Sequence, residues 1–165
     1  MAHALLSASS AERWLNCPPS ARLQEQFPDN TSEYAMEGTL AHEISELINR
    51  YNFGEMTKRK FNSELKKFKE NELYENEMEN HCSNYASYIH EKYNELKGRS
   101  KLEPLIFFEQ KVDYSKYAPE GFGTVDCLII SDKTIEVIDF KYGKHIAVSP
   151  QNNKQMMLYA LGAYI

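Results

Sequence analysis

The fold is decided by the stretch that runs from Gly123-Thr-Val-Asp126 to Ile138-Asp139-Phe140-Lys141. Asp126 stands directly before an apolar run, and a short polar turn then leads into a second β-rich run that ends near Asp139. A hairpin of this length brings the two carboxylates side by side. Asp139 and Lys141 are two residues apart, so in a strand both side chains point to the same face.

Two carboxylates at one point repel each other unless a cation joins them. Oxygen ligands of this kind suit Mg²⁺ or Mn²⁺, and a lysine beside them can orient a water molecule or stabilise charge on a phosphate. The plainer interpretation is that Asp126 and Asp139 make ordinary hydrogen bonds at strand ends and that Lys141 is a surface lysine. Because buried, unpaired carboxylates are costly, the pattern favours a metal site.

The composition indicates one soluble globular domain. The chain has 165 residues, of which 42% are hydrophobic and 26% are charged. No apolar run has the length of a membrane span, and the first residues lack the basic start of a signal peptide. Three widely separated cysteines form no CxxC pair, which favours reduced thiols. We therefore expect a cytoplasmic protein without a membrane partner.

Hydrophobic periodicity predicts a helical part over about 1–98, followed by a sheet and a last helix over about 103–165. The predicted helices lie around Trp14, over 32–51, over 72–97 and after Pro150, with residues 55–70 unassigned, and the predicted strands span about 104–112, 122–130 and 134–141. This order predicts an α+β or mixed α/β domain, with a three-stranded antiparallel meander flanked by helices.

Charge is unevenly distributed along the chain. The net charge of −5 argues mildly against a broad nucleic-acid surface, yet basic residues gather in 58–60 and 66–69 and acidic residues in 72–79. One interpretation is a solvated helical face with charges of both signs. The other is a local patch that follows phosphate groups.

Five segments in this order resemble the PD-(D/E)XK nuclease superfamily, in particular its RecB-like branch. That branch includes exonuclease domains of recombination enzymes, nucleases of CRISPR adaptation and phage-encoded domains of unknown function. The segments are Ser7–Ser10 through Trp14–Pro18, Glu37–Glu43, the GxxD-like Gly123–Asp126, the D-x-K-like Asp139–Gly143 and the QxxxY-like Gln155–Tyr159. A lone D-x-K is a weak signal, whereas five ordered motifs are much stronger.

The resemblance implies a restriction-endonuclease-like core that hydrolyses DNA phosphodiester bonds with Mg²⁺ or Mn²⁺, as in a phage or prophage recombination-type exonuclease. The implied metal ligands are His42, Asp126, Asp139 and the carbonyl of Phe140. Lys141 would position the attacking water, and Gln155 and Tyr159, at i and i+4, would help to fix the DNA strand or Lys141. Periodicity alone places His42 on a solvent face, so its ligand role rests on the resemblance.

Two departures from the family pattern leave alternatives open. Many relatives bind an iron–sulfur cluster through four cysteines; Cys17 could correspond to the first, and the other three have no counterpart here, so we expect no complete cluster. The fourth core strand also has no counterpart, and the apolar end of the sequence favours a truncated form, or a core completed by a protein partner or a second copy. An inactive nuclease-like protein that binds DNA or a protein, for example as an inhibitor of a host defence complex, is therefore the alternative function, and a hydrolase of another phosphoester is a weaker one.

Three further residues are secondary candidates. Glu109 lies on the first predicted strand, where it could approach the metals, although an ordinary edge-strand acid is the favoured interpretation. Glu46 is one turn beyond His42 and is a candidate supporting partner for that residue. His145, near the D-x-K loop, is a candidate DNA contact.

Overall fold

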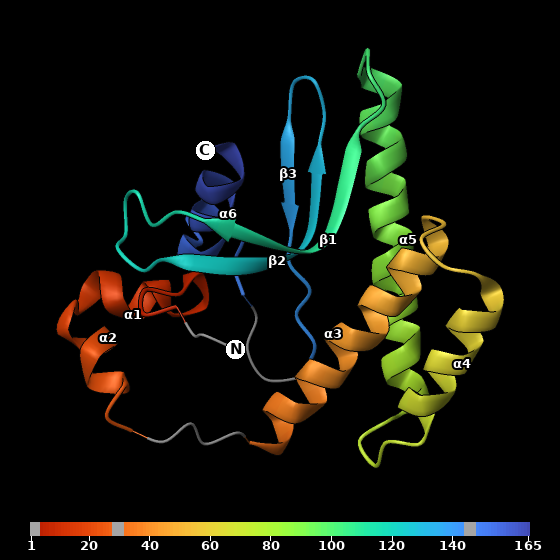
Figure 1. Cartoon of the computed structure of the whole chain (residues 1–165), viewed down its shortest axis with the longest axis horizontal. Helices are drawn as coiled ribbons and strands as arrows, with labels where there is room; N and C mark the ends of the chain where they lie inside the picture. Colours follow the sequence, from red (N-terminus) through yellow and green to blue (C-terminus); the bar gives the residue numbers. More distant parts are fainter. Residues whose placement is uncertain (1–3, 28–31, 144–147) are drawn as a thin grey trace.

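The computed structural model describes residues 4–27, 32–143 and 148–165. An antiparallel three-stranded sheet in the order β1-β2-β3 is flanked by helices (Figure 1), which confirms the predicted α+β fold class. The elements in chain order are the 3-10 turn η1 (Ala8–Ser10), α1 (Ala11–Asn16), α2 (Pro19–Gln24), α3 (Glu33–Asn52), α4 (Lys58–Lys69), α5 (Asn76–Arg99), β1 (Leu105–Asp113), β2 (Phe122–Ile130), β3 (Ile135–Ile138) and α6 (Lys154–Tyr164).

The two long strands bend near their middles (Figure 1). They pair in one register from Leu105↔Ile130 to Asp113↔Phe122, with a break in the pairing between Phe108↔Cys127 and Gln110↔Val125. Glu109 is the fifth of nine residues in β1 and has a φ of 50°, a left-handed conformation that non-glycine residues adopt at a cost. The same register places it opposite Asp126, the fifth of nine residues in β2. The bend therefore lies where two acidic residues face each other.

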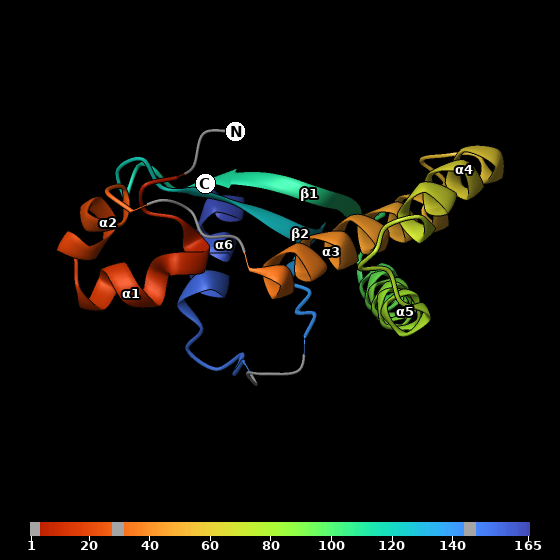
Figure 2. The same ribbon diagram turned by 90° about the horizontal axis from the view of Figure 1, so that it is seen from below.

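Two clusters of buried side chains hold helices on this bent sheet, and a third joins α3 and α5 with Phe140. Val125 packs with Trp14 and Tyr159 from the N-terminal helices and α6. Cys127, only two residues further along β2, packs with Ile89 of α5 instead. In a straight strand, residues two apart share a face, so the bend is what assigns them to different clusters. Figures 1 and 2 show the result, with α6, α1 and α2 at one end of the molecule and α3, α4 and α5 at the other.

The helix α3 follows its prediction closely. Ser32 caps it, since its hydroxyl accepts a hydrogen bond from the Ala35 N–H. Leu40 and Ile44 are buried against α5, as their spacing predicts. Met36, one turn earlier and predicted to be in the same stripe, is 46% exposed. The buried stripe of α3 therefore starts at its second turn, and His42 lies within the packed part of the helix.

Two helices occupy segments that the sequence pattern left unassigned or read as breaks. The Pro18-Pro19 pair ends α1, but Pro19 also begins α2, because proline is tolerated in the first turn of a helix. The helix α4 fills most of 55–70 and is capped by Thr57. None of its residues is buried, and Glu64 pairs with Lys67 at 2.8 Å. This arrangement supports the solvated-face interpretation of the basic block, and the phosphate-following patch stays a prediction.

The last strand is shorter than predicted. β3 ends at Ile138, not at Lys141, so the expectation that Asp139 and Lys141 share a strand face is wrong. The reason lies in the neighbouring strand, because the Asp126 Oδ2 accepts the Phe140 N–H at 2.6 Å. A side chain thus takes the place of a strand partner, and the chain leaves the sheet beside that carboxylate.

No helix within the described ranges is long and apolar enough to cross a membrane.

Candidate metal and catalytic site

Asp126 lies at the centre of the site because the strand that carries it is the middle strand of the sheet. Its side chain is 11% exposed. One oxygen accepts the Phe140 N–H, and the other lies 3.4 Å from His42 Nδ1. The hairpin therefore brings Asp126 against the start of the D-x-K segment, as the sequence predicts.

A second acid completes a group that the sequence only partly predicts. One ligand atom each from His42, Glu109 and Asp126 lies within 4.8 Å of the others. The three residues come from α3, β1 and β2, so tertiary packing alone assembles them. One imidazole nitrogen and two carboxylates form a donor set that fits Mn²⁺ or Mg²⁺. We call these three residues the Asp126 group.

The backbone at Glu109 is held in a costly conformation by its surroundings. A φ of 50° for a glutamate costs on the order of 1 kcal/mol. Arg50 of α3 donates from Nη2 to the carbonyl of Phe108 at 3.2 Å, directly before the strained residue. Arg50 is itself fixed by Glu46 at 2.7 Å. Glu46 therefore supports the Asp126 group through Arg50, and not through His42 as its sequence position suggested.

The titration behaviour of the Asp126 group reflects its crowded acids. Burial, together with the neighbouring charges of Asp126 and Glu46, raises the pKa of Glu109 to about 7. Burial alone would lower the pKa of His42, but the interaction with Asp126 and the charge of Glu109 outweigh it and raise that pKa. Each shift favours an added positive charge. Without metal, protons on Glu109 and His42 supply this positive charge. A bound divalent cation would supply a larger one.

The second carboxylate has its own partners. Asp139 is 9% exposed at its side chain, and its Oδ2 lies 2.7 Å from Lys141 Nζ. Its Oδ1 accepts a hydrogen bond from Gln155 Nε2 at 3.1 Å. Burial raises the pKa of Asp139, the Lys141 hydrogen bond opposes this, and Asp126 adds to it. We call Asp139, Lys141 and Gln155 the Asp139 group.

The helix α6 carries Gln155, the member of the Asp139 group that comes from outside the D-x-K segment. Gln155 Nε2 also reaches the hydroxyl of Tyr159 at 3.1 Å, so the predicted i, i+4 pair does form. Tyr159 is 5% exposed and packs so closely on Gly123 that a Cβ there would lie 2.5 Å from its ring. The glycine of the GxxD-like segment therefore has a packing role, which is to let the QxxxY-like helix approach β2.

Phe140 contributes in a different way from the one expected. Its backbone N–H binds Asp126, and its buried ring packs edge-on to His42 with the ring centroids 5.4 Å apart. On its other side the ring stacks with Tyr85 of α5 at 4.6 Å. The aromatic ring thus orients the imidazole, while the predicted role of its carbonyl stays a prediction.

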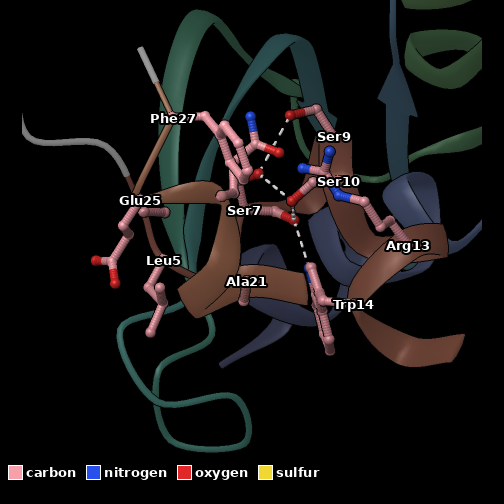
Figure 3. Close-up of a pocket in the computed structure, with 11 residues that line it drawn as sticks. Leu5, Ser7, Ser9, Ser10, Arg13, Trp14, Ala21, Glu25 and Phe27 are labelled. Atoms are coloured by element: carbon pink, nitrogen blue, oxygen red, sulfur yellow. Dashed lines mark hydrogen bonds between the residues drawn. The ribbon is translucent and has the colours of Figure 1, made fainter. Parts of the chain in front are cut away.

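The opening segment forms a separate hydrogen-bonded unit (Figure 3). The Trp14 indole donates to the Ser7 carbonyl at 2.9 Å, and the Ser7 and Ser10 hydroxyls lie 2.7 Å apart. They line a pocket of about 520 Å³ together with Arg13. None of its lining residues belongs to the two acidic groups. This segment therefore serves the site indirectly, since the adjoining Ala8 packs with Tyr159 in one core.

The structure thus brings together most of the predicted site. His42 and Asp126 meet in one group, and Asp139, Lys141 and Gln155 meet in the other. Glu109 joins the site against the favoured expectation of an ordinary edge-strand acid. The predicted strand bounds, paired about the loop between them, place it opposite Val125, and the observed register places it opposite Asp126. His145 lies outside the described residues.

Comparisons with known proteins identify a family for this chain but no function. No solved structure matches the chain. A family model described as a protein of unknown function, DUF2800, matches residues 3–165. Membership of the wider nuclease superfamily stays a prediction. Because the match covers nearly the whole sequence, the chain belongs to the DUF2800 family.

Proposed function

We propose that this protein is a divalent-metal-dependent deoxyribonuclease that hydrolyses phosphodiester bonds, as a recombination-type exonuclease does. The observation that carries the proposal is the meeting of His42, Glu109 and Asp126 within 4.8 Å, beside an aspartate that holds a lysine at 2.7 Å. Strain at Glu109 supports it, because strained residues cluster at functional sites.

The Asp126 group would hold Mg²⁺ or Mn²⁺, and Asp139 is near enough for the charge of Asp126 to raise the Asp139 pKa, after the larger effect of burial. When bound, such an ion supplies Lewis-acid stabilisation of charge on a phosphate. The Phe140 N–H keeps the Asp126 carboxylate oriented toward His42. The donors are thus fixed before a substrate arrives, which lowers the cost of reaching the reactive geometry.

Lys141 is the residue suited to act on the attacking water or on the phosphate. Its side chain is 47% exposed while its Nζ is tethered to Asp139, so the ammonium can reach a substrate without losing its anchor. Gln155 binds the opposite oxygen of Asp139. Asp139 therefore positions the ammonium, and Gln155 positions Asp139.

Paired cleavage assays test this function. End-labelled single- and double-stranded DNA would be incubated with Mg²⁺, Mn²⁺ or EDTA, and the parent compared with Asp139→Ala and Lys141→Ala. Asp132→Ala, in the exposed β2–β3 turn, is the matched control. We expect cleavage that requires metal, persists in the control and falls about 100-fold or more in both site variants. Product lengths would separate exonuclease from endonuclease action.

Two results would overturn the proposal. One is cleavage by Asp139→Ala and Lys141→Ala at the parent rate. The other is a folded parent that binds Mn²⁺ and cleaves no DNA, which would favour the alternative of a nuclease-like protein that acts by binding DNA or a protein partner.

A further inference from the structure

A cavity of about 620 Å³ lies between α5 and the segment that follows β3. The residues of its lining that matter here are Glu77, His81, Tyr85, Tyr88, Phe140 and Lys141. Its size suits one or two nucleobases or a ligand of similar bulk. Because Lys141 lines the cavity and is bound to Asp139, a molecule seated here lies directly beside the proposed reaction centre.

The wall provided by α5 is aromatic along one face. His81, Tyr85 and Tyr88 are spaced at i, i+4 and i+7, so they follow one another along the helix surface. Tyr85 is fixed by its stacking on Phe140. Tyr88, in contrast, is 47% exposed. An exposed tyrosine next to the stacked pair of Tyr85 and Phe140 offers an aromatic surface to a planar ligand.

The residues that line this cavity include charged groups of both signs. Lys141 provides a cation beside Asp139, whereas Glu77 and His81 pair with each other at 3.6 Å. A row of phosphates through the cavity would meet the Glu77 carboxylate. A single phosphate at Lys141, with its base directed toward the tyrosines, meets no such repulsion.

One polar atom in the wall has no internal partner. The Tyr85 hydroxyl is buried and makes no hydrogen bond among the described residues. Burial, and then the charges of Asp126, Asp139 and Glu109, raise the pKa of Tyr85. Its hydroxyl therefore lies toward the two acidic groups, and the rest of the side chain lines the cavity.

We infer that this cavity receives an unpaired nucleobase, so that the preferred substrate is single-stranded DNA or a frayed end. The inference rests on the proposed function, because that function places the phosphate at Lys141. Bases inside a duplex are stacked on each other and cannot present a free face, whereas single strands bind aromatic platforms through stacking.

Binding measurements in EDTA test the inference without cleavage. Fluorescence anisotropy would compare a short labelled oligothymidine, the same length of abasic strand and a matched duplex. Tyr88 is the residue to change, because its exposure lets the fold tolerate substitution. We expect Tyr88→Ala to weaken oligothymidine binding about 5- to 100-fold, and we expect Tyr88→Phe to retain it. The parent should bind the abasic strand weakly, with an affinity like that of Tyr88→Ala for oligothymidine. Duplex binding should not change.

Tyr117→Ala is the matched control, since Tyr117 is 61% exposed and lies in the loop between β1 and β2. If Tyr88→Ala binds oligothymidine like the parent, or weakens duplex binding equally, the inference is wrong. The same variants assayed for Mn²⁺-dependent cleavage separate the two proposals. Binding through Tyr88 without any cleavage would reject the nuclease and keep the base site. Metal-dependent cleavage with unchanged oligothymidine binding in Tyr88→Ala would support the nuclease and reject the base site.

Discussion

The Asp126 group and the Asp139 group lie next to each other but differ in how their buried carboxylates are paired. The Asp139 group is satisfied within the chain, since Lys141 and Gln155 each bind one carboxylate oxygen. The Asp126 group places a second acid, Glu109, against the first, and the charges of His42 and Arg50 offset this repulsion only in part, since the pKa of Glu109 is still raised. From this difference we infer that the Asp139 group positions the lysine and that the Asp126 group is suited to a cation.

The strongest test of this comparison is metal affinity. Asp126→Asn should lower Mn²⁺ affinity at least about 100-fold, whereas Asp139→Asn should lower it less than about tenfold, because Asp139 is not among the three residues that converge. Isothermal titration calorimetry with Mn²⁺ measures both. Equal losses of Mn²⁺ affinity in the two variants would show that Asp139 is itself a ligand, as the family resemblance implies. The two acidic groups would then form a single metal site.

The pH dependence of stability sharpens the same comparison. The pKa of Glu109 is raised from 4.5 to about 7, so the folded chain binds a proton that the unfolded chain has released. The associated stability is complete below about pH 4.5 and is lost as pH rises through about 7. The raised pKa values of His42 and Asp139 act in the same direction. Without metal, the melting temperature should therefore fall between about pH 5 and pH 8.

Added Mn²⁺ should reverse that trend, because the ion replaces the protons and competes with them less at higher pH. Thermal melting in EDTA and in Mn²⁺ across this range measures both effects. Glu109→Gln should remove much of the slope and most of the Mn²⁺ stabilisation. A slope that is unchanged in this variant would mean that Glu109 does not carry the shift.

The smallest expected effect is on the cleavage rate, from a change in the Asp139 group. Gln155→Leu removes the donor to Asp139 and should slow metal-dependent cleavage about tenfold while leaving Mn²⁺ affinity unchanged. Met157→Leu, at a 57% exposed position on the same helix, is the control. Single-turnover rates and titration calorimetry check the two halves of this prediction. A loss of Mn²⁺ affinity in Gln155→Leu would contradict the separation of roles.

Particular residues show which parts of the fold the local sequence pattern predicts correctly. The spacing of Leu40 and Ile44 was enough to predict the buried side of α3, and the β-rich runs around Asp126 were enough to predict the hairpin. The D-x-K segment was predicted as strand, but β3 stops at Ile138 because the Asp126 side chain captures the Phe140 N–H. That capture depends on a carboxylate fourteen residues away, which no local propensity contains.

Local pattern was enough to predict the three strands, the helices α1, α3, α5 and α6, and the approach of Asp126 to the D-x-K segment, because periodicity and hairpin length are local properties of the chain. Packing between elements brings Glu109 to His42 and Asp126, and brings Gln155 of α6 to Asp139. For Glu109 the cause is the bend in β1 and β2. Arg50 from a distant helix binds the strained backbone at that bend, and a contact between residues so far apart in the chain depends on packing.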